Sequence, residues 1–326
     1  MESSLYDPER GFYPTRTQTA DFYTAPELHP ASGAVLSDKI AALLTRVRGA
    51  RPGVGLSLVE AGCGDGTLAC QVARGLREKH PALADGLRFV LVERTRKDLT
   101  VAVRKLTAFG LPVDACTGVD RLPRFTGLLY SNELIDAFPA HLLQKKDDGV
   151  LEVYVDESGL ETLGGLSRPE LAAEAAAAAS TLAEGERHGV SLEARAWLRE
   201  AAAHLESGFL LTVDYGKRFA PGAPNPPRAY RRHQIVPALS SEPGTKDLTV
   251  PADFESLIAE GARAGLSLES YQSLSTFLIE GGIDAWLSAA AGDAAALYRE
   301  RARIKTLVHP EGMGETFKVL LQRKSL

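Results

Sequence analysis

Val59-Glu60-Ala61-Gly62-Cys63-Gly64-Asp65-Gly66-Thr67 is the stretch of sequence that decides the fold. The apolar run at residues 56–60 predicts a short buried strand, and residues 67–77 have helical spacing. Glycines at alternating positions let the backbone turn sharply and let a ligand approach without a clash at Cβ. The first turn of the following helix offers N–H groups that have no partner inside the helix. The stretch therefore predicts a strand, a turn and a helix that together hold a ligand.

The same alternation of short apolar runs and helices continues outward along the chain. Helices are predicted at residues 34–48 and 99–109. Further strands are predicted at residues 88–93, 113–117, 127–131, 209–214 and 316–321. Buried runs that alternate with helices are typical of a parallel sheet. We expect an α/β protein with a doubly wound, Rossmann-like sheet of seven strands that ends in an antiparallel hairpin.

An insertion interrupts this alternation. Residues 141–163 alternate in polarity around Asp147-Asp148-Gly149, which predicts an antiparallel hairpin. Alanine-rich helices are expected at 169–184 and 192–205. We expect residues 140–206 to form an inserted cap made of a hairpin and helices.

The two remaining parts of the chain have weaker patterns. Residues 217–247 predict a long loop that is rich in proline and basic around 228–233. Helices fit 252–264 and 273–290, with a strand candidate at 266–271, and we expect 217–290 to contribute to the substrate side. Residues 1–33 lack periodicity and predict an ordered, non-helical arm.

Composition limits the class of protein. The 326 residues are 44% hydrophobic and 24% charged, as in a globular chain with a sizeable core. A net charge of −5 argues against a nucleic-acid binder. Cys63, Cys70 and Cys116 have neither metal-ligand nor disulfide spacing, so we expect no metal site and a reducing compartment. No apolar run reaches the length of a membrane span and the N-terminus lacks the features of a leader, so we expect a cytoplasmic protein.

The acids at the predicted strand ends indicate which ligand the glycine turn holds. A dinucleotide site uses G-x-G-x-x-G to bind pyrophosphate, but this turn has G-x-G-x-G preceded by Glu60. A carboxylate at that place attracts an ammonium group, which favours the zwitterionic S-adenosylmethionine. Glu93, at the next strand end, is expected to accept hydrogen bonds from both ribose hydroxyls. We assign Glu60, Gly62, Gly64, Gly66 and Glu93 to this cofactor; the alternative is a purely structural glycine turn.

Four further residues lie in the turn or at strand ends. Asp120, after the third strand, is a candidate for the adenine amine. Cys63, inside the turn, is expected to be a small filler that contacts the cofactor and not a reactive thiol. Asp214, at the end of the fifth strand, is a substrate anchor or a turn residue, and Tyr215 stands beside it.

The segment 130–139 after the fourth strand indicates the chemistry. In methyltransferases of this architecture such residues border the transferred methyl group. Glu133 and Asp136 are three residues apart and would share a face of one helical turn, and Asn132 can accept and donate hydrogen bonds. Two carboxylates suit a guanidinium, whose planar fork they can align while they take its proton. The alternative is that Asn132 only caps a helix and the two acids only complete its first turn.

Over nearly its whole length the sequence resembles the MidA-type methyltransferases, whose mitochondrial members are complex I assembly factors. The motifs that carry the resemblance are residues 6–13, 21–27, 60–66, 132–139, 213–216, 230–231, 247–249, 253–254 and 313–320. The chain departs from the family at Ala20, where glycine is usual, and at Cys63 and Asp65, where alanine and arginine are common.

The resemblance implies a class I methyltransferase fold, one domain over residues 1–326, with S-adenosylmethionine as donor. It implies a protein arginine as acceptor, for example in a respiratory-complex subunit. It also implies that residues 1–33 close over the cofactor, so that Thr24 and Pro26 contact it. The alternatives are a small-molecule or peptide acceptor, or an assembly factor that binds S-adenosylmethionine and holds a partner; the sequence leaves a homodimer open.

Overall fold

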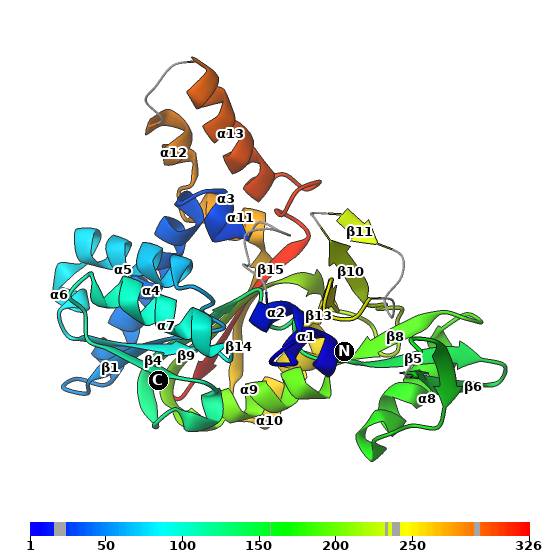
Figure 1. Ribbon diagram of the computed structural model, residues 1–326. Helices are drawn as coiled ribbons and strands as arrows, with labels where there is room; N and C mark the ends of the chain where they lie inside the picture. Colours follow the sequence, from blue (N-terminus) through cyan, green and yellow to red (C-terminus); the bar gives the residue numbers. More distant parts are fainter. Residues whose placement is uncertain (16–23, 157, 232–233, 237–241, 290–293) are drawn as a thin grey trace. The chain divides into compact units, whose positions relative to one another are not determined.

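The computed structural model describes residues 1–15, 24–156, 158–231, 234–236, 242–289 and 294–326 (Figure 1). These residues divide into two compact units. Unit 1 comprises Met1–Phe22, Ile135–Trp197 and Gly216–Leu257. Unit 2 comprises Tyr23–Leu134, Leu198–Tyr215 and Ile258–Leu326. The Asp21-Phe22-Tyr23 part of the second family motif lies outside the described residues.

Unit 2 is built on the sheet that the sequence predicts. Its strands are ordered β3-β2-β1-β4-β9-β15-β14. They are β1 (Leu56–Ala61), β2 (Leu87–Val92), β3 (Val113–Cys116), β4 (Phe125–Asn132), β9 (Leu205–Lys217), β14 (Ser267–Ser273) and β15 (Phe317–Lys324). The strands β3, β2, β1, β4 and β9 are parallel, whereas β15 is antiparallel to both β9 and β14. The predicted seven-stranded sheet is thus confirmed; an eighth short strand, β13 (Ala252–Asp253), pairs with the end of β9.

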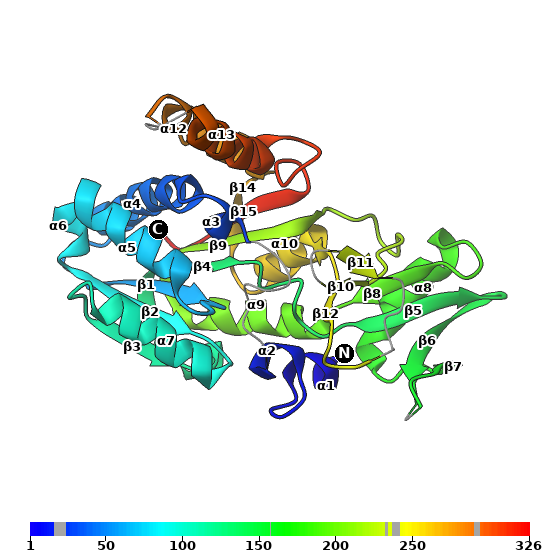
Figure 2. The same ribbon diagram turned by 45° about the horizontal axis from the view of Figure 1, so that its top comes forward.

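Three of the helices beside this sheet were predicted: α4 (Ala31–Ala50), α5 (Thr67–Lys79) and α7 (Arg96–Thr107). The short α6 (Pro81–Ala84) was not predicted. Figure 2 shows α4 and α5 side by side. They approach closely, since a Cβ at Gly75 of α5 would lie 2.1 Å from the Ser37 hydroxyl of α4. The main hydrophobic core lies between these helices and the apolar strands, and it belongs entirely to unit 2.

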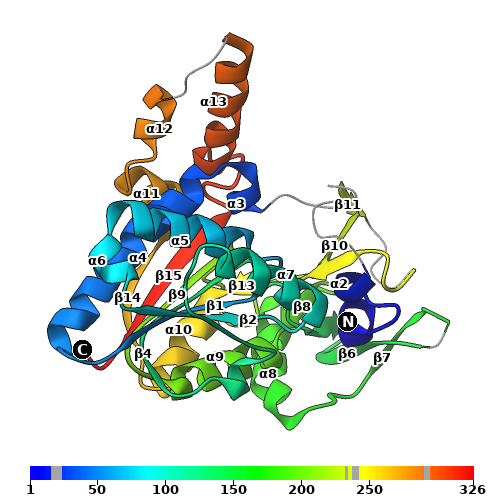
Figure 3. The same ribbon diagram turned by 60° about the vertical axis from the view of Figure 1, so that its left-hand side comes forward.

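The C-terminal third of the chain differs from the prediction in two places. The helix expected at 273–290 is two helices, α11 (Leu274–Glu280) and α12 (Asp284–Ala289), because Gly281 and the left-handed Gly282 (φ 78°) interrupt it. A further helix, α13 (Ala294–Val308), was not predicted; Figure 3 shows it beside α12. The expected helix at 252–264 is α10 (Phe254–Arg263).

Unit 1 contains two small sheets. The first is ordered β7-β6-β5-β8 and consists of β5 (His141–Lys146), β6 (Gly149–Val155), β7 (Glu161–Gly164) and β8 (Arg187–Val190). The predicted hairpin is β5–β6, and the predicted helices are α8 (Ala172–Thr181) and α9 (Leu192–His204). The second sheet, β11-β10-β12, was expected to be a loop; it consists of β10 (Arg228–Arg231), β11 (Gln234–Val236) and β12 (Asp247–Thr249).

The N-terminal segment is helical, contrary to the prediction. It forms α1 (Glu2–Tyr6), α2 (Phe12–Thr15) and α3 (Ala25–Leu28) before α4 begins at Ala31. These helices are too short to produce an apolar period in the sequence. The helices α1 and α2 belong to unit 1, and α3 and α4 belong to unit 2. In the described part of the chain, every helix is too short or too polar to cross a bilayer.

Candidate active site

The glycine turn after β1 has a left-handed backbone conformation that glycine adopts most easily. Gly62, Gly64 and Gly66 have φ values of 72°, 50° and 80°. The N–H of Gly62 donates to the carbonyl of Val92 at 2.8 Å, which fastens the turn to the end of β2. A Cβ at Gly66 would lie 2.8 Å from Cα of Ala102 in α7. The turn is therefore fixed by its own backbone hydrogen bonds, and it leads directly into α5.

Asp65 stabilises the start of α5 from inside the turn. Its carboxylate accepts hydrogen bonds from the N–H and the hydroxyl of Thr67, at 3.0 and 2.7 Å, and from Lys105 at 2.6 Å. Burial opposes ionisation of Asp65, but the hydrogen bonds from Lys105 and Thr67 outweigh it and lower its pKa. The acid at this position is thus part of the turn's own scaffold.

Glu60 is buried at the end of β1, with an exposed fraction of 4%. Its carboxylate accepts a hydrogen bond from the Tyr130 hydroxyl at 2.8 Å, since the two residues are paired in register between β1 and β4. Burial raises the pKa of Glu60 to about 8, although the Tyr130 hydrogen bond lowers it. An ammonium ligand would restore the ionised form. Sequence reasoning missed Tyr130; the available signal was a lone tyrosine in a buried aliphatic strand.

Glu93 follows β2 and faces the turn. One of its oxygens accepts from the N–H of Gly64 at 3.1 Å and the other from the N–H of Thr95 at 2.8 Å. The Thr95 side chain also donates to this carboxylate. A carboxylate has about four acceptor positions, so one remains for a ribose hydroxyl. Burial raises the pKa of Glu93, and the backbone hydrogen bonds lower it. The turn and these two acids fit the ammonium group and a ribose hydroxyl of S-adenosylmethionine.

Glu133 adopts a strained backbone conformation just after β4. Its φ of 51° lies in the left-handed region that non-glycine residues rarely adopt. Its N–H donates to the carbonyl of Val213 at 2.9 Å, and its carboxylate accepts from Asn132 Nδ2 at 3.1 Å and from the N–H of Ala25 at 3.3 Å. Burial and the charge of Asp214 raise the pKa of Glu133 to about 8. Strain and a raised pKa at one residue are typical of functional sites.

Asp214 is completely buried on the neighbouring strand β9. Its carboxylate accepts a hydrogen bond from the N–H of Tyr215 at 2.8 Å. The Tyr215 ring packs against Phe317, with the ring centroids 5.9 Å apart. Asn132, Glu133, Asp214 and Tyr215 therefore form one group in unit 2 at the ends of β4 and β9.

Asp136 does not share a helical face with Glu133, so that prediction was wrong. The residues after Asn132 form bends and turns, and Glu133 itself has a left-handed backbone, so the two acids do not lie on one helical turn. Asp136 belongs to unit 1, where it is buried and its carbonyl accepts from the N–H of Val250 at 3.1 Å. Its charge helps to raise the pKa of Tyr13, whose hydroxyl donates to Asp247 at 3.0 Å. Asp136 is thus grouped with Tyr13 and Asp247.

The segment Thr24–Pro26 lies beside the site in unit 2. Its helix α3 is fixed by Glu27, which accepts from the N–H and the hydroxyl of Thr24 at 3.0 and 3.1 Å. The carbonyl of Pro26 accepts from Gln71 Nε2 of α5 at 2.9 Å. Together with the Ala25–Glu133 hydrogen bond, these contacts join the segment to α5 and to the end of β4. Contact of Thr24 and Pro26 with the cofactor stays a prediction.

The two remaining candidates have opposite environments. Asp120 lies in a short 3₁₀ turn, and its side chain is 69% exposed and 4.0 Å from Arg121. This exposure gives no support to a contact with adenine. Cys63 is buried and burial raises the pKa of its thiol far above the ordinary value, which keeps it unreactive. Among the residues that the structure describes, no three histidine, cysteine or acidic side chains are placed to hold a metal ion.

Comparisons with known proteins agree with this geometry. A family model described as "Putative S-adenosyl-L-methionine-dependent methyltransferase" matches residues 36–272. The chain is 28% identical to "Protein arginine methyltransferase NDUFAF7, mitochondrial" of Danio rerio, across 97% of this chain and 80% of that protein. It is 26% identical to the Bos taurus protein of the same name, across 98% and 78%. A crystal structure of a Burkholderia thailandensis protein bound to S-adenosyl-homocysteine superposes with a TM-score of 0.84, at 28% identity, over 99% of this chain and 86% of that one.

Proposed function

The chain belongs to this family of S-adenosyl-L-methionine-dependent methyltransferases, and we propose that it methylates the guanidinium group of an arginine in a protein. S-adenosylmethionine is its cofactor. Two findings support a protein arginine as acceptor. One is the similarity to relatives named protein arginine methyltransferase. The other, which carries the proposal, is the pair of acids Glu133 and Asp214.

The two carboxylates of this pair can together bind one cationic group. The N–H of Glu133 donates to the carbonyl of Val213, the residue before Asp214, so the two acids lie near each other. Burial raises the pKa of Glu133 most, and the charge of Asp214 raises it further. Within the described residues, the hydrogen-bond donors to Glu133 are the neutral amides of Asn132 and Ala25. A bound guanidinium supplies the positive charge that permits both acids to ionise. Its planar fork also fits carboxylates with two parallel hydrogen bonds.

Glu133 is also placed to take a proton during the reaction. S-adenosylmethionine, when bound, supplies the methyl group as an electrophile on its sulfonium. A guanidinium pKa near ~13 exceeds that of Glu133 by about 5 units, or ~7 kcal/mol, so the proton does not leave before bond formation. The acidity of the guanidinium nitrogen rises as its new N–C bond forms and the S–C bond breaks. The proton then passes to the Glu133 carboxylate, leaving methylarginine and S-adenosylhomocysteine.

Label transfer tests this function directly. The purified protein is incubated with methyl-labelled S-adenosylmethionine and an extract of its host lacking the gene, and the protein fraction is hydrolysed. Methylarginine in the hydrolysate is the expected result, and Glu133→Gln should remove it. Label confined to small molecules would instead identify a metabolite or peptide acceptor. No label at all, with calorimetry showing that S-adenosylhomocysteine binds, would contradict an enzyme and favour an assembly factor.

A further inference from the structure

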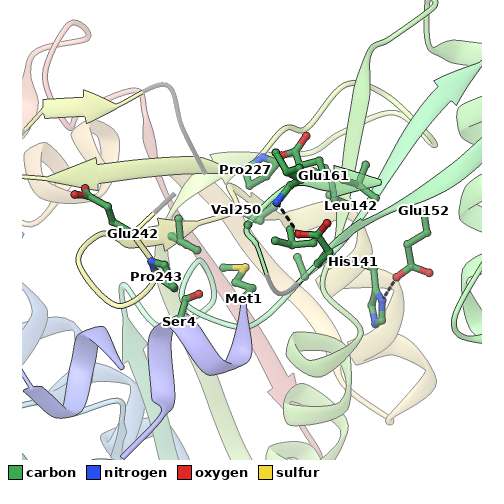
Figure 4. A pocket seen from close by; sticks show the side chains of 18 of the residues that line it. Met1, Ser4, His141, Leu142, Glu152, Glu161, Pro227, Glu242, Pro243 and Val250 are labelled. Carbon is green, nitrogen blue, oxygen red and sulfur yellow. Dashed lines mark hydrogen bonds and ion pairs between the residues drawn. The ribbon is translucent and has the colours of Figure 1, made fainter. Parts of the chain in front are cut away.

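Unit 1 contains a cavity that the active-site chemistry does not use. Its volume is about 760 Å³, within the range of ligand pockets. Its walls come from α1, β5, β6, residues 156 and 158–161 and the segment 242–250, all within unit 1. Figure 4 shows its lining side chains.

The cavity exposes apolar surface. Val153 and Val155 of β6, Leu142 of β5 and Leu160 of the turn contribute to its lining, and so does Val250. Val155 and Leu160 are 54% and 65% exposed, which is high for large apolar side chains. Apolar residues gathered in a concave site favour an apolar ligand group over water.

All formally charged side chains in this lining are acidic. They are Glu152, Asp156, Glu161 and Glu242, and neither lysine nor arginine lines the described cavity. Figure 4 shows Glu152, Glu161 and Glu242 on different sides of it. Hydrogen bonds from Ser158 and Leu160 lower the pKa of Asp156 and keep it ionised. Glu161 and Glu242 are ion-paired with Arg187 and Arg231, and Glu152 is buried against His141. Asp156 is therefore the acid of the described lining whose charge is left to attract a cation.

Arginines outside the lining hold two of these acids in place. Arg187 donates to Glu161 at 3.2 Å, and Arg231 donates to Glu242 at 2.8 Å. Glu152 is 4% exposed and accepts from His141 Nδ1 at 2.7 Å and from Ser167 Oγ at 2.9 Å. The acids on the cavity wall are thus fixed before any ligand arrives, which reduces the entropy that binding must overcome.

We propose that this cavity binds a segment of the protein acceptor in which an apolar side chain is flanked by lysine or arginine. The apolar side chain lies against Val153 and Val155, and the cationic flank faces Asp156. The inference rests on the proposed function, because it assigns the cavity to the substrate of that reaction. A protein substrate needs such a contact, since an arginine side chain alone does not distinguish one protein from another.

A pair of peptides tests the cavity without any turnover. One fluorescent peptide is rich in leucine and arginine, and its match has glutamate in place of each arginine. We expect fluorescence anisotropy to show at least tenfold tighter binding of the cationic peptide, weakening as salt is added. Val153→Trp should fill the cavity and weaken that binding at least tenfold, while Asp156→Asn, which keeps an oxygen for the Leu160 N–H, should weaken it about threefold. Equal binding of the two peptides would overturn the proposal.

Matched variants distinguish loss of binding at the cavity from general effects of substitution in unit 1. Leu166→Trp and Glu170→Gln change exposed residues of unit 1 outside the lining and should bind the peptide as the wild type does. Unchanged calorimetric binding of S-adenosylhomocysteine shows that unit 2 of each variant is folded, and unchanged fluorescence of Trp197, in a Trp286→Phe background, shows the same for unit 1. In the label-transfer assay, Val153→Trp should raise KM for the protein acceptor and leave kcat nearly unchanged.

Different results contradict the cavity proposal and the proposed function. Methylarginine formed by Val153→Trp with the wild-type KM would overturn the cavity proposal and leave the proposed function standing. Absence of methylarginine with the wild-type protein would overturn the proposed function, and with it the assignment of the cavity to an acceptor.

Discussion

The backbone N–H of Ala25 donates a hydrogen bond to the carboxylate of Glu133 at 3.3 Å. This contact joins the first residue of α3 to the residue that follows β4, 108 positions later in the chain. The N-terminal segment therefore touches the group that we propose to receive the proton. A neutral donor at this place stabilises the ionised carboxylate without competing with a cationic substrate for charge.

Glu133→Gln should lower kcat by roughly 10²–10⁴-fold, the usual contribution of a positioned proton acceptor. The amide keeps an oxygen for the Ala25 N–H, so α3 and cofactor binding should be undisturbed. Initial rates of label transfer and calorimetry with S-adenosylhomocysteine measure the two quantities on the same sample. Wild-type kcat in this variant would remove Glu133 from the chemistry.

The left-handed backbone of Glu133 makes a separate prediction about stability. Glu133→Gly and Glu133→Ala both remove the carboxylate, but only glycine relieves the steric cost at φ 51°. We expect the glycine variant to be more stable by about 1 kcal/mol, visible as a higher melting temperature in calorimetry. Both variants should be inactive. Equal melting temperatures would mean that the strain at this residue is negligible.

Cofactor binding should release a proton from Glu60. Its pKa of about 8 means that the cofactor-free protein carries this proton below about pH 8, whereas an ammonium ligand favours the ionised form. The affinity for S-adenosylhomocysteine should therefore rise with pH between about pH 6 and 8 and then level off. Calorimetry in two buffers of different ionisation enthalpy counts the released proton.

Two variants identify the source of that proton. Glu60→Gln should abolish its release, and Glu133→Gln should not. Tyr130→Phe removes the hydrogen bond that stabilises ionised Glu60, so the pH midpoint of binding should move upward. Proton release that persists in Glu60→Gln would assign the titration to another group.

Gly66 and Gly53 form a matched pair that separates backbone strain from steric clash. Both have φ near 80°, but a Cβ at Gly66 would lie 2.8 Å from Cα of Ala102, whereas a Cβ at Gly53 meets nothing within 4 Å. Gly53→Ala should cost about 1 kcal/mol of stability and leave cofactor affinity unchanged. Gly66→Ala should cost more and weaken S-adenosylhomocysteine binding at least tenfold, because α7 must move. Equal effects of the two substitutions would show that the close packing on Ala102 is unimportant.

The sheet of unit 2 was predictable because local patterns determine it. The strands β1, β2 and β4 are short apolar runs, and Glu60 and Glu93 mark strand ends directly in the sequence. Contacts between distant residues were not predictable in this way. The Tyr130–Glu60 hydrogen bond depends on the register between β1 and β4, and the Ala25–Glu133 bond depends on the path of the N-terminal segment.

The errors also have physical causes. Sequence spacing alone placed Glu133 and Asp136 on one helical turn, but spacing does not reveal a left-handed residue. The short strands β10, β11 and β12 each have three or four residues, too few for a visible alternation. The helix α13 has its apolar residues unevenly spread among charged ones, with only Ile304 and Leu307 buried.

Asp247 should make unit 1 less stable as the pH rises. Burial raises the pKa of Asp247 to about 6, although the hydrogen bond from Tyr13 lowers it. The folded chain then holds this proton more tightly than the unfolded chain, so stability is lost between about pH 4 and 6. A pKa shift of roughly 2 units lowers the free energy of unfolding by at most ~3 kcal/mol above pH 6, compared with its value below pH 4. Asp247→Asn keeps an acceptor for Tyr13 and cannot ionise, so it should be more stable than the wild type at pH 8 by ~1–3 kcal/mol, and equal to it near pH 4.

The two tryptophans allow this effect to be measured in unit 1 alone. Trp197 lies in unit 1, with its ring centroid 5.9 Å from that of Phe138, and Trp286 lies in unit 2. In a Trp286→Phe background, urea unfolding followed by fluorescence reports on Trp197. Asp148→Asn, which removes an exposed acid of the same unit, serves as the control and should show no such pH-dependent gain. A gain for Asp247→Asn that is the same at pH 4 and pH 8 would mean that ionisation of this buried acid does not limit the stability of unit 1.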